Sequence, residues 1–113
     1  MIVKLDFKEE QLIEITWVYN NIDCETKTIS AKLFRIAGFD ELFAIHGDEW
    51  FGYEISELST GMLVSQSEPT ISKAKACARD KMKRNKKQWE QIKNKSIEQL
   101  TKLGYKYPLN TII

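Results

Sequence analysis

The stretch WFGYEISELSTGMLV, residues 50–64, decides the fold class of this chain. In its first half, Phe51, Tyr53 and Ile55 alternate with smaller or polar residues, which is the period-two pattern of a half-buried strand. Residues 59–61, Ser-Thr-Gly, then supply a tight turn, and a second apolar alternation follows it. We therefore expect a β-hairpin here, as part of an antiparallel sheet.

The remainder of the first half also has the composition of strands, with β-branched and aromatic residues between Gly, Asn and Asp. We expect strands near residues 2–7, 11–19, 27–36, 41–46, 50–58 and 61–66. Two alternatives stay open. Residues 8–22 also place apolar side chains on one helical face, and residues 39–46 could form a single helical turn.

After residue 68 the apolar period changes from two to 3.6. Pro69 and Thr70 open a helix, with Thr70 as the expected N-cap, and Gly104 with Pro108 beyond it gives the stop. Between them one helical face holds the apolar residues Ile71, Ala74, Ala78, Met82, Trp89, Ile92, Leu100 and Leu103. The simplest interpretation is one helix over residues 71–103.

Such a helix is long for the domain. At 1.5 Å per residue it spans about 50 Å, whereas a compact chain of this length is roughly 34 Å across. Either the helix breaks near Asn85, the weakest helix former in this region, or it projects and carries its apolar stripe to a second subunit. The second case predicts a homodimer through the C-terminal helix, with Trp89, Ile92, Leu100 and Leu103 at the interface.

The expected architecture is a single α+β domain over residues 1–113, in which an antiparallel β-meander of four to six strands precedes the helix packed across it. Apolar residues make up 42% of the chain and charged residues 29%, as in ordinary globular proteins. The chain shows no internal repeat and no low-complexity linker. Without an apolar run long enough for a membrane span or a signal-like start, we expect a cytoplasmic protein with no membrane partner.

The two halves of the chain carry opposite charge. Residues 1–68 hold 13 acidic and 5 basic side chains, net −8, while residues 69–113 hold 3 acidic and 12 basic ones, net +9. Asymmetry of this size indicates either pairing within the fold or a charged partner.

The basic charge is densest between residues 79 and 87. On a helix, one broad face would present Arg79, Lys83, Arg84, Lys86 and Lys87. These cations could bind the phosphates of nucleic acid or of a nucleotide ligand. In the alternative interpretation they form a solvated face that balances the acidic half of the same fold.

The acidic half offers a second candidate contact surface, formed by Asp48, Glu49, Trp50, Phe51 and Glu54. A strand would send the adjacent Trp50 and Phe51 to opposite faces, which leaves one of them exposed as a contact site. Acidic side chains that could mimic phosphates for a protein partner are Glu9, Glu10, Glu14, Asp40, Glu41, Asp48, Glu49, Glu54 and Glu57.

Catalytic signatures are missing from the sequence. His46 is the only histidine, but no GxSxG elbow accompanies it, and a metal site at His46, Asp48 and Glu49 would need further ligands. Cys77 falls in the helix as a small buried residue, while the acidic neighbours of Cys24 should raise its pKa. There is also no phosphate-binding glycine loop. The sequence therefore predicts a protein that is not an enzyme and that needs no cofactor or metal.

Residues 57–61, a return strand, Pro69-Thr70 and an alanine-rich helix form a series similar to that of many small proteins of phages and mobile elements. Residues 71–76 also resemble the last helix of double-stranded-RNA-binding domains, without that family's opening helix or glycine-rich loop. Small size, segregated charge and missing catalytic motifs predict a non-enzymatic binding protein that modulates or inhibits a macromolecular partner, most simply a protein, in the manner of the small anti-defence inhibitors of phages and mobile elements. Binding of nucleic acid or a nucleotide through residues 79–87 is the alternative.

Overall fold

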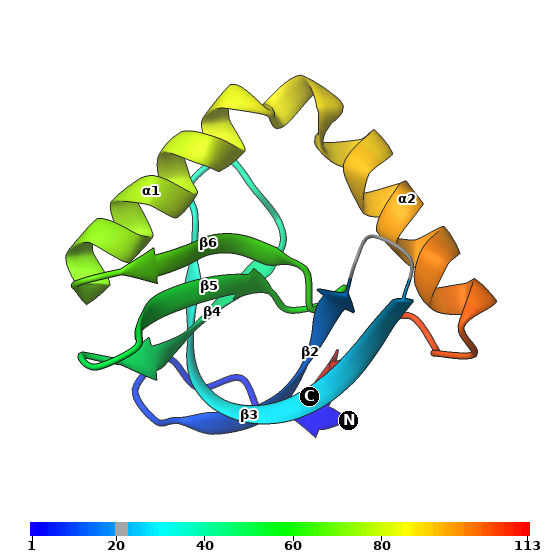
Figure 1. The fold of residues 1–113 in the computed structure, drawn as a ribbon, viewed down its shortest axis with the longest axis horizontal. Coiled ribbons are helices and arrows are strands. Elements are labelled where there is room, and N and C mark those ends of the chain that lie inside the picture. The colour runs from blue at the N-terminus through cyan, green and yellow to red at the C-terminus, as the bar shows by residue number, and fades with distance from the viewer. Residues whose placement is uncertain (20–22) are drawn as a thin grey trace.

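The structure is a computed structural model that describes residues 1–19 and 23–113. It is an α+β fold in which a curled antiparallel sheet is followed by two helices (Figure 1). The elements are β1 (Ile2–Val3), β2 (Gln11–Tyr19), β3 (Asp23–Arg35), β4 (Leu42–Asp48), β5 (Gly52–Glu57), β6 (Leu63–Glu68), α1 (Ile71–Arg84), a 3₁₀ turn (Lys86–Gln88), α2 (Trp89–Lys102) and β7 (Thr111–Ile112).

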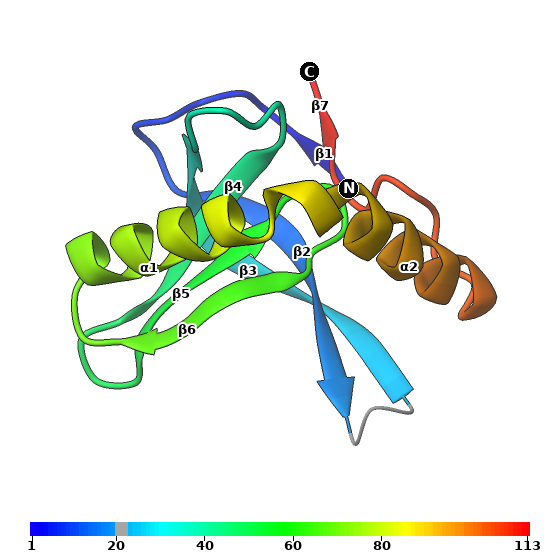
Figure 2. The ribbon, with the colours of Figure 1, turned by 90° about the horizontal axis from the view of Figure 1, so that it is seen from above.

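The sheet has the order β2-β3-β4-β5-β6, so each strand pairs with its neighbour in sequence. This confirms the predicted meander, including strands where residues 11–19 and 42–46 also fitted a helix; residues 20–22 of the first ambiguous stretch lie outside the described part. The sheet curls until the edge strand β2 meets the turn that leads into the other edge strand, β6, where the Thr16 amide donates to the Gly61 carbonyl at 3.0 Å. Beyond that hydrogen bond, β2 and β6 diverge (Figure 2).

The first predicted strand is much shorter than expected. Only Ile2–Val3 forms a strand, and it pairs in parallel with β7 rather than joining the large sheet. The reason lies at Asp6, whose carboxylate accepts the backbone amides of Lys8 at 2.9 Å and Glu9 at 3.3 Å. This side-chain-to-backbone turn ends the extended segment before residue 7.

The helical half breaks at Asn85, so the prediction of one continuous helix is wrong and the alternative is confirmed. Asn85 leaves the helical conformation (φ −103°, ψ 15°), and its side-chain amide donates to the Lys81 carbonyl at 2.8 Å. The single 3₁₀ turn that follows redirects the chain into α2. With this bend the molecule measures 35 × 29 × 29 Å, a size that a straight helix of about 50 Å would exceed.

The predicted helix ends agree with the structure. Thr70 is the N-cap of α1, since its hydroxyl accepts the Lys73 amide at 3.1 Å. At the other end α2 stops at Lys102, and Gly104 adopts the positive φ of 87° that a helix stop favours.

Two apolar clusters cover the two faces of the sheet. The first lies between the sheet and the helices and comprises Ile36, Phe43, Ile45, Ile55, Val64, Ala74, Ala78, Met82 and Trp89. The second fills the inside of the curl and comprises Val3, Ile13, Ile15, Ala31, Leu33, Leu42, Ala44 and Leu58. Helix α1 lies along β5 and β6 (Figure 2). Its cations at residues 79, 83 and 84 are exposed.

A polar clamp holds α2 against the sheet. One carboxylate oxygen of Glu41, Oε1, accepts both the Trp89 indole N–H at 2.9 Å and the Lys93 ammonium at 3.1 Å. The ion pair is largely shielded from water, with the Glu41 and Lys93 side chains 11% and 18% exposed. It therefore fixes the position of α2 relative to the turn before β4.

Candidate binding surfaces

The turn between β4 and β5, residues 48–51, presents two aromatic side chains to solvent. We call it the aromatic tip. Trp50 and Phe51 are 84% and 85% exposed. The expectation that a strand sends them to opposite faces was wrong, because β5 begins only at Gly52. Both aromatic rings are therefore available, rather than one.

Hydrogen bonds and glycines fix the backbone of the aromatic tip. Asp48 Oδ1 accepts the amides of Trp50 at 2.9 Å and Phe51 at 2.8 Å. Gly47 and Gly52 flank the tip with positive φ angles of 101° and 93°. A Cβ at Gly47 would lie 2.2 Å from the Gly52 carbonyl oxygen, so a side chain cannot replace it without moving the turn. The tip is thus organised before any partner binds.

The acidic residues around the tip divide into two groups. Asp48 and Glu49 are exposed beside the aromatic rings, whereas Glu54 is half-buried on β5. Burial raises the pKa of Glu54, as expected of a carboxylate that has lost part of its water. The exposed residues of the candidate contact surface are consequently Asp48, Glu49, Trp50 and Phe51.

Two of the carboxylates predicted to mimic phosphates are not at the surface. Glu41 belongs to the α2 clamp. Glu57 has no exposed surface, and its carboxylate accepts the Ser59 hydroxyl together with the amide and hydroxyl of Thr60, both at 2.7 Å. Glu57 therefore holds the β5–β6 turn together and cannot meet a partner. Sequence spacing gives no signal for either role, because both depend on contacts formed in the fold.

The predicted basic face exists on α1 and the 3₁₀ turn. Arg79, Lys83, Arg84, Lys86 and Lys87 are all exposed. Arg84 pairs with Asp80 one helical turn away at 3.0 Å, and the Lys86 ammonium lies 5.6 Å from the ring centre of Phe39.

Within the described part of the chain, these cations form no ion pair with the acidic half. Among residues 1–19 and 23–113, the ion pair that joins the two halves of the chain is Lys93–Glu41, and it lies outside the basic face. No ion pair among the described residues therefore supports the interpretation that the positive charge of residues 79–87 balances the negative charge of the acidic half. Their charge remains directed to solvent.

His46 lies on β4. Its Nε2 is 3.1 Å from the Ser56 hydroxyl, and burial lowers the pKa of His46 from 6.5 to about 4. A neutral histidine beside a serine resembles a base and its nucleophile, but Ser56 is only 1% exposed. The Ser56 hydroxyl is therefore shielded from solvent in the folded chain.

The two thiols occupy different environments. Burial raises the pKa of Cys24, and the charge of Asp23 adds to this effect, so the predicted direction is confirmed. Cys77 is half-buried on α1 instead of fully buried. In the part of the chain that the structure describes, no three His, Cys, Asp or Glu side chains come together as metal ligands.

The four residues predicted at a dimer interface differ in how far the single chain buries them. Trp89 and Leu100 are 5% and 2% exposed within the single chain, and Ile92 is half-buried against the first cluster. Only Leu103, 41% exposed at the end of α2, keeps its apolar surface free. The bend at Asn85 thus removes the physical reason for expecting a second subunit on this stripe.

No helix of the described residues has the length and apolar character to cross a membrane. Comparison with known proteins identifies no matching family model, no curated protein of significant similarity and no matching solved structure.

Proposed function

We propose that this chain is a non-enzymatic binding protein that docks on a protein partner through the aromatic tip and modulates that partner. The observation that carries the proposal is the exposure of Trp50 and Phe51, 84% and 85%, on a turn whose backbone is already fixed. Aromatic side chains on a rigid turn are the usual anchors of protein interfaces.

The energetics favour an interface at this point. Burying a large apolar side chain gains about 1.5 to 3 kcal/mol, and here little conformational entropy is lost because the tip is ordered beforehand. An isolated exposed apolar residue requires no explanation, but two adjacent ones at the end of a hairpin form a projecting patch.

Charge indicates the chemistry of the partner. Asp48 and Glu49 flank the rings, and residues 1–68 carry a net charge of −8. This field repels nucleic acid and steers a cationic surface toward the tip. The expected partner is a protein with an apolar pocket for the two rings and Lys or Arg at its rim.

A pulldown from the source cell tests this proposal. The wild-type chain should retain a stoichiometric protein, and the double variant Trp50→Ala, Phe51→Ala should lose it while folding normally, with binding weakened by at least about tenfold. Leu103→Ala, at the far end of α2, removes exposed apolar surface elsewhere and should leave capture unchanged. An assay of the captured protein then shows whether its activity changes on binding.

Retention of the same partner by the double variant would move the interface away from the tip. A wild-type chain that captures no stoichiometric protein, or that turns over a substrate, contradicts the proposal as a whole.

A second candidate function is the binding of nucleic acid or a nucleotide by the basic face. It is supported by the exposure of its five cations and by the lack of described ion pairs from them to the acidic half. Their positions on one helix and the following turn match the spacing of a phosphate-contacting surface.

A further inference from the structure

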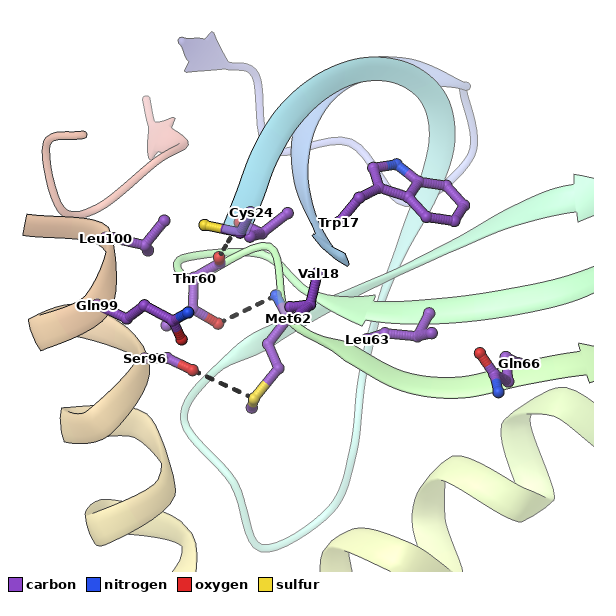
Figure 3. Close-up of a pocket in the computed structure, with 11 residues that line it drawn as sticks. Trp17, Val18, Cys24, Thr60, Met62, Leu63, Gln66, Ser96, Gln99 and Leu100 are labelled. Atoms are coloured by element: carbon purple, nitrogen blue, oxygen red, sulfur yellow. Dashed lines mark hydrogen bonds between the residues drawn. The ribbon is translucent and has the colours of Figure 1, made fainter. Parts of the chain in front are cut away.

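Helix α2 covers the opening of the curled sheet without filling it. The edge strands β2 and β6 diverge after the hydrogen bond between Thr16 and Gly61, and α2 lies across the gap. A cavity of about 390 Å³ remains between them (Figure 3). Its walls come from α2 on one side, which contributes Ser96, Gln99 and Leu100, and from the sheet on the other.

The described walls of the cavity consist of uncharged side chains. None of the described residues that line it is charged, although charged residues make up 29% of the chain. The apolar part of the lining consists of Trp17, Val18, Cys24, Met62, Leu63 and Leu100. Gln66, Ser96 and Gln99 add uncharged groups that can donate and accept hydrogen bonds.

Hydrogen bonds hold the floor of the cavity in place. The Thr16 hydroxyl donates to the Thr60 carbonyl at 3.0 Å. The Thr60 hydroxyl in turn donates to the Glu57 carboxylate and accepts the Met62 amide. The Ser96 hydroxyl donates to the Met62 sulfur at 3.4 Å, which links α2 to this floor. Because the α2 clamp fixes the start of the helix as well, the helix cannot easily collapse onto the sheet.

We propose that this cavity binds a small uncharged molecule with an apolar body of up to three rings and at least one hydrogen-bonding group. Its volume falls within the roughly 300 to 1,000 Å³ of ordinary ligand pockets, and apolar walls with a few polar groups are their usual composition. A charged ligand would lose its water without meeting an opposite charge. The site lies apart from the aromatic tip, so this inference goes beyond the proposed function.

Fluorescence titration with N-phenylnaphthylamine, an uncharged aromatic amine, tests the site. The wild-type chain should bind it saturably with one molecule per chain. Ser96→Phe places a ring in the cavity and should weaken binding by at least about tenfold. The matched control is Asn94→Phe, which adds the same ring on the exposed side of α2 and should leave binding unchanged.

A second measurement needs no variant. Cys24 lines the cavity, whereas Cys77 on α1 does not. Saturating N-phenylnaphthylamine should slow the labelling of Cys24 by a maleimide several-fold and leave Cys77 unaffected, as mass spectrometry of the labelled peptides would show. Because both thiols are in one molecule, Cys77 serves as the internal control.

The absence of saturable binding to the wild-type chain overturns the proposal, as does equal slowing of labelling at both thiols. Equal affinity of the wild type and Ser96→Phe places the probe elsewhere and also overturns it. Anilinonaphthalene sulfonate tests the ligand class, since tighter Ser96-dependent binding of this anion than of the neutral amine contradicts an uncharged ligand.

Discussion

His46 shows how a single residue can couple stability to pH. Burial lowers its pKa from 6.5 to about 4, so between these values the unfolded chain takes up a proton that the folded chain does not. The contribution of neutral His46 is fully present above pH 6.5. It is lost progressively as the pH falls toward 4, by about 3 kcal/mol in all.

Urea denaturation at pH 7 and pH 4.5 measures this loss. His46→Gln keeps a hydrogen-bonding group beside Ser56 but cannot titrate, so the fall in the free energy of unfolding between the two pH values should be smaller than in the wild type. Other groups titrate equally in both proteins. An identical fall in the two would show that the folded chain protonates His46 as readily as the unfolded chain does.

At the scale of the elements, the position of α2 depends on Glu41. Burial alone would raise the pKa of Glu41, but hydrogen bonds from Trp89 and Lys93 outweigh it and the pKa is lowered. The stability from this carboxylate is therefore present above its ordinary pKa and is lost as the pH falls through the lowered value.

Glu41→Ala should reduce the free energy of unfolding by about 1 to 3 kcal/mol, because the Trp89 indole and the Lys93 ammonium lose their acceptor. Glu90→Ala, on the exposed first turn of the same helix, should change it by less than about 0.5 kcal/mol. Urea denaturation at pH 7 compares the two variants. Equal effects would mean that the clamp adds nothing beyond an ordinary surface charge.

The basic face on α1 and the 3₁₀ turn can also be tested by substitution. If it binds phosphates, the affinity for a mixed nucleic-acid pool should fall steeply with salt, with a slope near −0.9 per phosphate contacted in duplex DNA. Replacing Lys83, Arg84, Lys86 and Lys87 with Ala should then flatten that slope by about 3 units. The chain should still fold, since none of these residues is buried.

A variant with Lys8, Lys95, Lys102 and Lys106 changed to Ala provides the comparison for total charge, because it removes four exposed cations that lie before β2 and on and after α2. The dependence of its nucleic-acid affinity on salt should stay close to that of the wild type. A wild-type chain that binds no DNA, RNA or nucleotide at micromolar concentration removes the nucleic-acid function.

For the whole molecule, the charge asymmetry was read from the sequence but its arrangement was not. The halves of net −8 and +9 indicated either internal pairing or a charged partner. In the fold, α1 turns its apolar side to the sheet and its cations to solvent, and Lys93–Glu41 is the ion pair between the halves in the part of the chain that is described. The aromatic tip and the basic face thus present opposite charges to solvent at two separate places on the surface.

The sequence by itself determined the meander, the Thr70 cap and the helix stop at Gly104. Each of these depends on residues that are close in sequence. The strands and helices follow from an apolar period of two or 3.6, the cap from the Thr70 side chain that accepts an amide three residues on, and the stop from the positive φ of Gly104. The turn of residues 48–51 also depends on local interactions, since Asp48 accepts the amides two and three residues ahead. It was not predicted because the alternation of apolar residues from residue 50 onward favoured a strand there.

Only the tertiary structure decided the burial of Glu57, the clamp between Glu41 and α2, and the uncharged cavity beside that helix. Glu41 and Trp89 are 48 residues apart, and no local pattern marks a carboxylate that will be enclosed by a distant helix. The sequence allowed either a bend or a rod at Asn85. The bend buries Trp89 and Leu100 within one chain, and the gap it leaves beneath α2 exists because the curled sheet closes at Thr16 and Gly61 and then opens again.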